Sequence, residues 1–255
     1  MTSGQAAAGR VAGKVALVTG GGGGFGEGIA RLLAAEGARV VVADLDRAAA
    51  ARVAEAIGGV AVGGDVASGA DVAAMVAACE GLGGLDIVVN NAGTTHRNQP
   101  MLGVGEAEFD RVYAVNVKSL FHMMHAAVPV LRAQGRGGSI INISSTAGIR
   151  PRPGLVWYNG TKGAMNTMTQ CMAIELAPDR IRVNAVCPVL GATALTEAFM
   201  GEAASPAVLA RFMATIPLGR MSQPSDIANA CLWLAEDASA FITGVLLPVD
   251  GGRTA

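Results

Sequence analysis

A tyrosine and a lysine four positions apart offer the clearest acid–base chemistry in the chain. Tyr158 and Lys162 fall in a segment with helical character, so both side chains would share one helix face. A free tyrosine has a pKa of about 10 and is a poor base at neutral pH. A nearby ammonium and a second cation could lower that pKa by stabilising the phenolate. Taken alone, the spacing is common and favours a structural pair, so its chemistry depends on the surrounding motifs.

A glycine-rich turn follows the first apolar run and offers a site for an anion. The turn extends over residues 19–26, and Gly21, Gly23 and Gly26 match the pattern Gly-x-Gly-x-x-Gly. Unpaired backbone N–H groups at a helix start bind a pyrophosphate, and glycine lets it approach the backbone. No Gly-Lys-Ser/Thr follows, which disfavours a nucleoside-triphosphate loop. In a chain this rich in glycine the match alone is weak, and a flexible turn is the alternative.

An acidic residue at the end of the second strand indicates which dinucleotide would bind. Asp44 lies about 20 residues past the glycine turn, where a carboxylate accepts hydrogen bonds from the adenosine ribose hydroxyls. Its charge would repel a 2′-phosphate, so we expect NAD rather than NADP. The alternative for Asp44 is a helix N-cap, a role that Asp46 could fill instead. Leu45, Asp65 and Val66 would lie near the adenine.

Further motifs occur in a fixed order along the chain. They are Thr19, Gly20, Gly24 and Gly26; Asn90-Asn91-Ala92-Gly93; Asn116; Ser145, 13 positions before Tyr158; Val183-Asn184 before Cys187-Pro188; and Val249-Asp250-Gly251-Gly252. In this order the chain resembles the short-chain dehydrogenase/reductase family over nearly all of residues 13–252. Several ordered motifs at proper spacings make a chance match untenable.

The resemblance implies a role for each of four residues. Tyr158 would be the general acid/base, taking the alcohol proton as hydride leaves for the nicotinamide. Ser145 would hydrogen-bond the substrate oxygen, with Ser144 as the alternative that satisfies local backbone. Lys162 would bind the nicotinamide ribose and lower the pKa of Tyr158. Asn116 would hold a water that passes the proton toward solvent.

The resemblance also implies the cofactor contacts. They would come from the glycine turn, the second and third strand ends, the loop after the fourth strand and the loop after the sixth: Gly20, Gly24, Phe25, Gly26, Asp44, Leu45, Asp65, Val66, Asn91, Ala92, Gly93, Tyr158, Lys162, Pro188, Val189 and Thr193. Val189 departs from the family, which has glycine there. Because valine does not readily adopt positive φ, we expect the local backbone path to differ.

The substrate pocket is expected beside this constellation. In the resembled family, the region at about 190–216 covers the substrate as a lid, with ordinary packing as the alternative for its apolar side chains. His96 and Trp157, together with Ser145 and Tyr158, would contact the substrate. A solvated loop is the alternative for His96, and simple packing is the alternative for Trp157. His122 and His125 lack nearby acidic or cysteine ligands and are interpreted as structural.

The order of elements predicts the fold that must position these residues. Continuous apolar runs predict buried strands of a parallel sheet at 15–19, 39–43, 85–89 and 139–143, with weaker candidates at 60–62, 182–186 and 245–249. Helical segments are expected at 26–36, 47–57, 71–80, 106–133, 158–177 and 224–235. This alternation predicts an α/β fold: one Rossmann domain with a doubly wound parallel sheet of about seven strands.

Composition excludes several classes of protein. The chain has 255 residues, a net charge of −1 and no basic run, which argues against nucleic acid or an anionic membrane as partner. Hydrophobic residues make up 51% but aromatics only 4%, so the core must be aliphatic. We expect a flexible N-terminus over residues 1–12 without a secretory signal, one domain over 13–255, and a cytoplasmic location. The four cysteines are far apart, which predicts buried free thiols and no metal site.

Three functions compete. The first is an NAD-dependent dehydrogenase acting on a small alcohol, polyol or ketone, assembled as a homotetramer through the two long helices and the last strand, as the resemblance implies. The second is an NADPH-dependent 3-oxoacyl-[acyl-carrier-protein] reductase, against which Asp44 and the lack of a basic cluster argue. The third is a non-catalytic dinucleotide sensor, which would normally lose part of the Asn116, Ser145, Tyr158 and Lys162 set.

Overall fold

The described residues of the chain form one parallel sheet flanked by helices. The computed structural model describes residues 9–191, 196–203 and 205–255. Within them, seven strands pair in parallel in the order β3-β2-β1-β4-β5-β6-β7. The strands are β1 (Val15–Thr19), β2 (Arg39–Asp44), β3 (Val60–Gly63), β4 (Ile87–Asn90), β5 (Gly138–Ile143), β6 (Ile181–Pro188) and β7 (Leu246–Val249). The strand order reverses between β1 and β4, where open α/β sheets bind ligands beyond their carboxyl ends.

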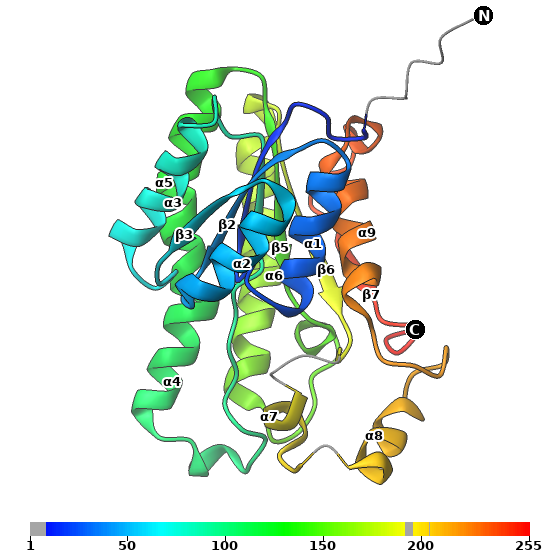
Figure 1. Ribbon diagram of the computed structural model, residues 1–255. Coiled ribbons are helices and arrows are strands. Elements are labelled where there is room, and N and C mark those ends of the chain that lie inside the picture. Colours follow the sequence, from blue (N-terminus) through cyan, green and yellow to red (C-terminus); the bar gives the residue numbers. More distant parts are fainter. Residues whose placement is uncertain (1–8, 192–195, 204) are drawn as a thin grey trace, which may run out of the picture.

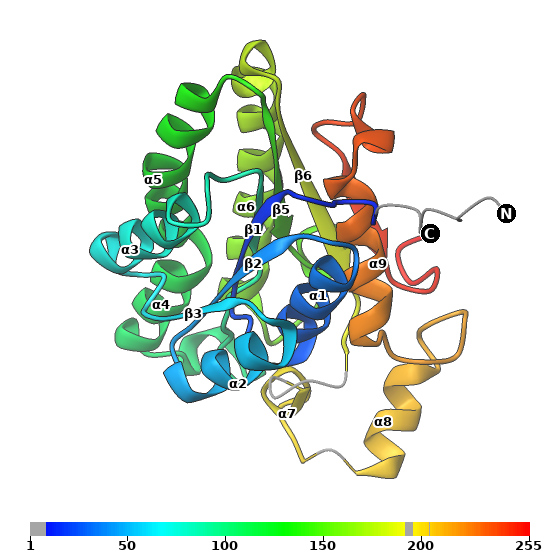
Figure 2. The ribbon, with the colours of Figure 1, turned by 45° about the horizontal axis from the view of Figure 1, so that its top comes forward.

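Helices cover both faces of this sheet, as Figures 1 and 2 show. One face carries α1 (Gly24–Ala35), α2 (Arg47–Ile57) and α9 (Pro224–Ala235). The other carries α3 (Gly69–Glu80), α5 (Ser119–Gln134) and α6 (Val156–Leu176), and α4 (Glu106–Tyr113) precedes α5. The short helices α7 (Thr196–Met200) and α8 (Pro206–Met213) lie together beyond the carboxyl ends of the strands (Figure 1). The predicted doubly wound architecture is confirmed.

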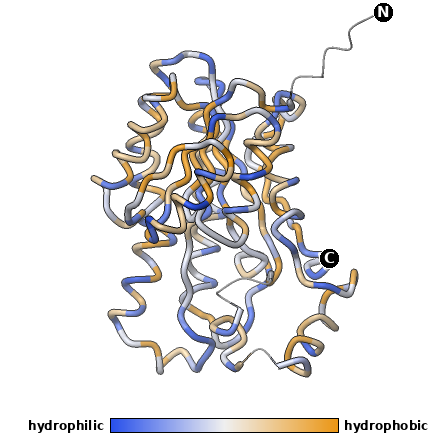
Figure 3. Tube along the Cα trace, viewed as in Figure 1, coloured by the Kyte–Doolittle hydropathy of each residue, from blue (hydrophilic) through white to orange (hydrophobic). Residues whose placement is uncertain are grey.

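The core consists of aliphatic side chains on the two faces of the sheet. Along β1, Ala16 and Val18 face the α1 layer, whereas Val15 and Leu17 face the α5 layer, and all four are fully buried. Burying one such Val or Leu side chain contributes roughly 1.5–3 kcal/mol. Figure 3 shows hydrophobic residues concentrated along the central strands. Burial on both faces explains why these strands are continuous apolar runs rather than alternating ones.

The predicted elements occur within a few residues of their expected bounds, with one difference in kind. A single helix was expected over 106–133, but its middle, Ala114–Lys118, is π-helical and joins α4 to α5. A π-helical turn holds about one extra residue, and five residues are too few for the hydrophobic period to reveal it. Such turns are frequent at functional sites, and this one contains Asn116.

The N-terminal segment is attached to the core. Val11 is fully buried, and the guanidinium of Arg10 pairs with Glu236, at 2.5 Å between Nε and Oε2. The expectation of a flexible segment over 1–12 is therefore corrected for residues 9–12, while residues 1–8 lie outside the described part.

Three cysteines are buried as expected, but Cys171 is exposed. No helix among the described residues has both the length and the apolar character that a bilayer crossing requires.

Candidate active site

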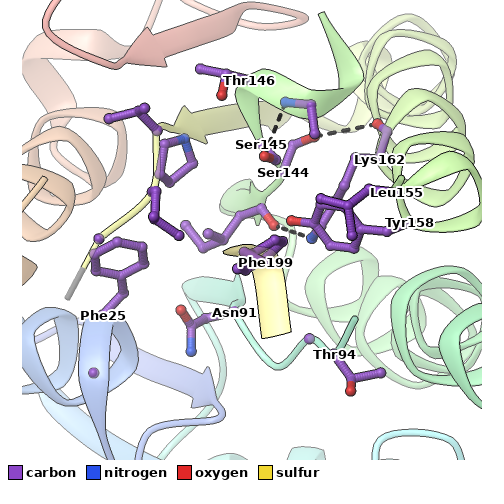
Figure 4. Close-up of a pocket in the computed structure, with 18 of the residues that line it drawn as sticks. Phe25, Asn91, Thr94, Ser144, Ser145, Thr146, Leu155, Tyr158, Lys162 and Phe199 are labelled. Carbon is purple, nitrogen blue, oxygen red and sulfur yellow. Dashed lines mark hydrogen bonds between the residues drawn. The ribbon is translucent and has the colours of Figure 1, made fainter. Parts of the chain in front are cut away.

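A cavity of about 310 Å³ opens at the carboxyl ends of the central strands (Figure 4). Its walls come from the glycine turn, the loop after β4, the end of β5, the start of α6, the end of β6 and the lid. The lining residues are Gly20, Gly23, Gly24, Phe25, Asn91, Ala92, Gly93, Thr94, Ile143, Ser144, Ser145, Thr146, Ala147, Arg150, Arg152, Leu155, Tyr158, Lys162, Pro188, Val189, Leu190, Gly191, Phe199, Phe212 and Arg253.

The structure brings Ser145, Tyr158 and Lys162 together in this cavity. Tyr158 and Lys162 lie one turn apart on α6, and the Lys162 Nζ is 5.8 Å from the centre of the tyrosine ring. That ammonium donates to the Ile143 carbonyl at the end of β5, at 2.8 Å. Ser145 follows β5 directly and accepts a hydrogen bond from the Ala147 N–H at 3.0 Å. The phenol, the ammonium and the hydroxyl therefore converge from two elements that the sheet holds in fixed register.

The two adjacent serines differ in their surroundings. Ser144 is buried, and its hydroxyl donates to Asn166 Oδ1 at 2.6 Å. Ser145 is half-buried and hydrogen-bonds the Tyr158 side chain, which Ser144 does not. Ser144 is thus the serine that satisfies its own surroundings, and Ser145 is the one available to a substrate oxygen.

Burial dominates the titration of the central pair. Burial raises the pKa of Tyr158 to about 12, opposed by the hydrogen bond from Ser145 and the charge of Arg152. Burial also lowers the pKa of Lys162 to about 8. Lys162 donates to the Ile143 carbonyl, and the predicted effect of its ammonium together with a second cation on the pKa of Tyr158 stays a prediction. A low pKa at Tyr158 needs positive charge beyond what the side chains supply.

Asn116 acts on the backbone of the loop after β4. Its Oδ1 accepts from the Thr94 N–H at 2.8 Å, and its Nδ2 donates to the Thr94 carbonyl at 2.8 Å and to Thr161 Oγ1 at 3.0 Å. The side chain is fully buried and lies behind the cavity wall rather than in it. Asn116 therefore ties this loop to α6, and its predicted water-holding role stays a prediction.

The glycine turn packs as closely as a phosphate site requires. A Cβ on Gly26 would lie 2.0 Å from the Gly20 carbonyl oxygen, so no side chain fits there. The Asn91 Nδ2 donates to the carbonyls of Thr19 and Gly20 at 2.9 and 3.0 Å. Thr19 Oγ1 in turn accepts from the Asn91 and Ala92 N–H groups. The turn after β1 is thus held directly by the loop after β4.

Asp44 lies at the outer edge of this turn. Its carboxylate accepts from the Gly22 N–H at 2.9 Å and from the Asp46 N–H at 3.0 Å. Asp46, not Asp44, caps α2 through the N–H groups of Ala48 and Ala49. The N-cap alternative for Asp44 is therefore excluded, and a carboxylate remains beside the glycine turn. The nearby Arg52 is committed to Glu27, whose pKa it lowers to about 2.

The residues expected near the adenine do not line the cavity. Asp65 accepts from the Ala67 N–H at 2.9 Å, which forms its own local turn. Val66 is buried and borders a small hollow behind Ala92. Leu45 is 75% exposed beside Asp44. Their contacts to the adenine remain a prediction.

The backbone of the loop after β6 is unstrained at Val189, the position where the family has glycine. Among the described non-glycine residues only Arg180 has positive φ, so Val189 has ordinary backbone geometry. The Val189 carbonyl accepts from Ser222 Oγ at 3.0 Å, and its N–H donates to the Val249 carbonyl at 3.3 Å. Pro188 and Val189 both line the cavity as expected. The expected carboxamide contact, Thr193, lies outside the described residues.

Two expected substrate contacts lie away from the cavity. Trp157 donates to the Met101 carbonyl and packs edge-on against Phe109, because successive helix residues point about 100° apart. His96 is fully buried, and its Nε2 accepts from the Tyr158 N–H at 3.5 Å. Neither side chain lines the cavity, so both expectations are corrected: Trp157 packs, and His96 supports the backbone at the start of α6.

Several cavity residues were not anticipated from the sequence. They are Arg150, Arg152 and Arg253; Phe199 and Phe212, which also line the cavity, belong to the region that was expected to cover the substrate. Phe199 packs edge-on against Tyr158, with ring centres 4.9 Å apart. The sequence carries a local signal for two of these residues, the run Arg-Pro-Arg-Pro between Ser145 and Tyr158. It carries none for Arg253, because that contact arises only in the folded chain.

Comparisons with known proteins agree with this arrangement. A family model described as enoyl-(acyl carrier protein) reductase matches residues 21–254. The chain is 51% identical over 249 residues to 4-formylbenzenesulfonate dehydrogenase of Comamonas testosteroni, covering 94% of this chain and 97% of that one. It is 38% identical over 253 residues to 2-(S)-hydroxypropyl-CoM dehydrogenase 3 of Xanthobacter autotrophicus, covering 96% and 98%.

Solved structures show the same likeness. A 3-ketoacyl-(acyl-carrier-protein) reductase from Brucella melitensis, complexed with NADH, has a TM-score of 0.90 and 45% identity, with 96% of this chain and all of that chain (100%) covered. Carveol dehydrogenase from Mycobacterium avium, in complex with NAD, has a TM-score of 0.89 and 31% identity, with 96% and 99% covered. The chain belongs to the short-chain dehydrogenase/reductase family, and is an oxidoreductase that acts on CH–OH or carbonyl groups with a nicotinamide dinucleotide.

Proposed function

We propose that this protein transfers a hydride between NAD(H) and the CH–OH or C=O group of a small alcohol, polyol or ketone, with Tyr158 as the acid/base. The observation that carries the proposal is the convergence of Ser145, Tyr158 and Lys162 on one cavity beside the glycine turn. The sequence spacing alone left a structural pair as the alternative. The position of all three side chains at the carboxyl ends of the strands favours a catalytic role over a structural pair.

The residues divide the chemistry between them. Ser145 donates a hydrogen bond to the substrate oxygen, and Tyr158 takes or returns the hydroxyl proton. Lys162 holds a ribose hydroxyl and stabilises the phenolate, and Asn116 fixes the Thr94 backbone that forms the adjoining wall. When bound, the oxidised nicotinamide supplies the hydride acceptor and a positive charge. The protein's own contribution is orientation and a partly dry cavity, in which charges act strongly.

The residues at the turn fit a dinucleotide, and Asp44 favours NAD over NADP. Gly26 lets the turn pack closely, because a Cβ there would meet the Gly20 carbonyl, and Gly23, where a Cβ would meet open space, lines the cavity in which a pyrophosphate would lie. The Asp44 carboxylate stands beside the turn, where it would accept from ribose hydroxyls and repel a 2′-phosphate. Of the neighbouring cations, Arg52 is already paired with Glu27. Gly20, Gly24 and Phe25 would hold the cofactor's phosphates, and Pro188 and Val189 its nicotinamide end.

An acyl-carrier reductase is the second candidate, and one observation favours it. The Brucella relative named as a 3-ketoacyl-(acyl-carrier-protein) reductase is complexed with NADH, so a preference for NAD does not exclude an acyl substrate. The Comamonas relative, by contrast, is named for an aromatic aldehyde that bears a sulfonate. A substrate panel with both compound types separates the two candidates. A sensor is disfavoured, because Asn116, Ser145, Tyr158 and Lys162 are all present.

A homotetramer and a cytoplasmic location stay proposals. The exposed apolar side chains include Phe121 on α5, Ile174 on α6 and Phe241 just before β7, which are 56%, 79% and 104% exposed. These positions coincide with the long helices and the last strand, through which we expect four copies to associate.

A further inference from the structure

Three guanidinium groups gather at the substrate end of the catalytic cavity. Arg150 and Arg152 come from the segment between β5 and α6, and Arg253 comes from the turn after β7. The guanidinium carbons of Arg152 and Arg253 lie 5.1 and 5.3 Å from the centre of the Phe212 ring. The Arg150 Nη1 donates to the Arg253 carbonyl at 3.0 Å, which fixes the two segments together.

One of these cations, Arg152, stands near the reacting group. The charge of Arg152 acts on Tyr158, where it opposes the effect of burial on the phenol. Arg152 also donates to the Phe199 carbonyl at 2.6 Å, and the Phe199 ring packs against Tyr158. A charge placed there is suited to meet the substrate.

These three arginines form no ion pair with a carboxylate of the described residues, whereas eight others in that part of the chain do. Among these eight are Arg10, Arg31, Arg52, Arg132, Arg136 and Arg220. The charge of Asp250 acts on Arg253, but the oxygens of Asp250 accept hydrogen bonds from Gly252 and Thr254 rather than from the guanidinium. Glu202, across a neighbouring cavity, is paired with Arg211. None of the three guanidinium groups is therefore in an ion pair with a carboxylate of the described residues, although the charge of Asp250 acts on Arg253 from nearby.

The cost of this arrangement appears in the titration of both residues. Burial and the charge of Arg253 lower the pKa of Arg152, and burial and the charge of Arg150 lower the pKa of Arg253. Like charges that are half-buried beside aromatic rings repel one another, and an oxyanion would neutralise them. Each guanidinium presents five N–H donors in a planar fork, so donors remain after the bonds to Phe199 and Thr215.

We propose that Arg152 and Arg253 bind an acid group of the substrate, so the enzyme acts on alcohols or aldehydes that carry a carboxylate or sulfonate at their far end. The proposal rests on the proposed dehydrogenase function of the same site. Leu155, Phe199 and Phe212 line the space around these charges, which fits an apolar or aromatic spacer. Tyr158 and Ser145 hold the reacting oxygen at one end, and the arginines hold the anion at the other.

Kinetics on matched substrates test the proposal first. The compounds are 4-(hydroxymethyl)benzoate, 4-(hydroxymethyl)benzenesulfonate and the neutral 4-methylbenzyl alcohol, with NAD⁺. We expect a kcat/KM at least about tenfold higher for one or both acids, since charge-assisted bidentate contacts are strong. Arg253→Gln, and separately Arg152→Gln, lower the acid-to-neutral ratio of kcat/KM by about tenfold or more. Arg132→Gln is the matched control, because that exposed arginine pairs with Asp179 far from the cavity, and it leaves the ratio unchanged.

Binding separates this proposal from the proposed function. Benzoate, benzenesulfonate and the neutral benzenesulfonamide are titrated calorimetrically into the NADH-saturated protein, a measurement that needs no turnover. Acid binding that exceeds amide binding, and that weakens about tenfold in Arg253→Gln with NADH affinity retained, supports the anion site. Equal affinity for acid and amide, an unchanged acid affinity in Arg253→Gln, or a loss confined to NADH overturns it. Failure of the proposed function appears separately, as absent turnover with intact acid binding.

Discussion

At the scale of single residues, the site depends on two buried titratable groups with opposed needs. The hydroxyl of Tyr158 is held neutral by burial, while the ammonium of Lys162 is partly deprotonated by it. Around neutral pH the phenol is therefore neutral, whereas the ammonium stays mostly charged. Ionisation of the phenol needs additional positive charge nearby, which an oxidised cofactor would supply.

The burial of Lys162 should leave a signature in stability. The pKa of Lys162 in the folded protein, about 8, is below the usual lysine value of 10.5, so the unfolded chain binds more protons between these two pH values. Stability due to this group therefore rises with pH through that window. We expect the unfolding free energy of the wild type to rise by up to about 3 kcal/mol relative to that of Lys162→Met between about pH 7 and about pH 10. Urea unfolding at several pH values measures this, and a pH-independent difference would show that Lys162 is not buried as an ammonium.

Asp44 should decide between the two nicotinamide dinucleotides. Asp44→Asn removes the charge that repels a 2′-phosphate, so the ratio of kcat/KM for NADP⁺ to NAD⁺ should rise by about tenfold or more. Asp46→Asn is the matched control, because asparagine caps a helix as well as aspartate and this carboxylate only caps α2. Equal ratios in wild type and Asp44→Asn would refute the assignment.

The residue-scale predictions from sequence succeed where partners are close along the chain. The spacing of Tyr158 and Lys162 on one helix, and of Ser145 after one strand, depends only on local geometry, so the sequence predicts their convergence. His96 and Trp157 were expected in the cavity because they neighbour motif residues. Successive side chains on a helix are rotated by about 100°, so the side chain of Trp157 points away from the cavity that Tyr158 lines. Arg253 was missed because it reaches Arg150 across 103 positions.

At the scale of elements, the β1–α1 turn unites stability with cofactor binding. Gly26 must lack a side chain because the Gly20 carbonyl occupies that space, whereas Gly23 has open space and extended backbone, with φ of −166°. The two glycines thus separate packing from ligand access, although both belong to the same motif.

Two substitutions exploit this difference. Gly26→Ala should destabilise the protein by about 1–3 kcal/mol, because the turn must open to admit a methyl group. Gly23→Ser should leave the melting temperature unchanged or raised, since serine is a good N-cap, but should weaken NADH binding because position 23 lines the cavity. Calorimetry and NADH titration on both variants provide the readouts. Equal melting temperatures for the two variants would contradict the packing account.

Sequence patterns predicted most elements but not the change of helix type at Asn116. Strands buried on both faces produce continuous apolar runs, which can be recognised in the sequence. The helices α2 and α5 end at glycines in the left-handed conformation, with φ of 66° and 64°. The π-helical turn is five residues long, which is too short for the periodicity of apolar residues to report it. The lid helices α7 and α8 are short, and their length falls below what periodicity resolves.

At the scale of the molecule, distant segments close the structure around the sheet. The N-terminal Arg10 and Lys14 pair with Glu236 and Asp237 after α9, and α9 packs against α1. The C-terminal turn after β7 brings Arg253 to the cavity. The N-terminal part of the described chain therefore holds the segment after α9, and the C-terminal turn forms part of the cavity wall.

Assembly is predicted to involve the exposed apolar side chains at the long helices and last strand. Light scattering should give a mass four times the 25.6 kDa of one chain. Phe121→Glu or Phe241→Glu should reduce that mass, because a charge cannot be buried unpaired in an interface. A monodisperse species with the mass of a single chain would contradict the proposed tetramer.

The central claim is that Tyr158 exchanges the proton while NAD accepts the hydride. The most direct test measures NADH formation by wild type and Tyr158→Phe against alcohols, polyols and the hydroxy acids described above. The account predicts turnover with NAD⁺ in the wild type, a loss of at least about 10²-fold in kcat for Tyr158→Phe, and retained NADH affinity in the variant. Equal turnover in wild type and variant would contradict it.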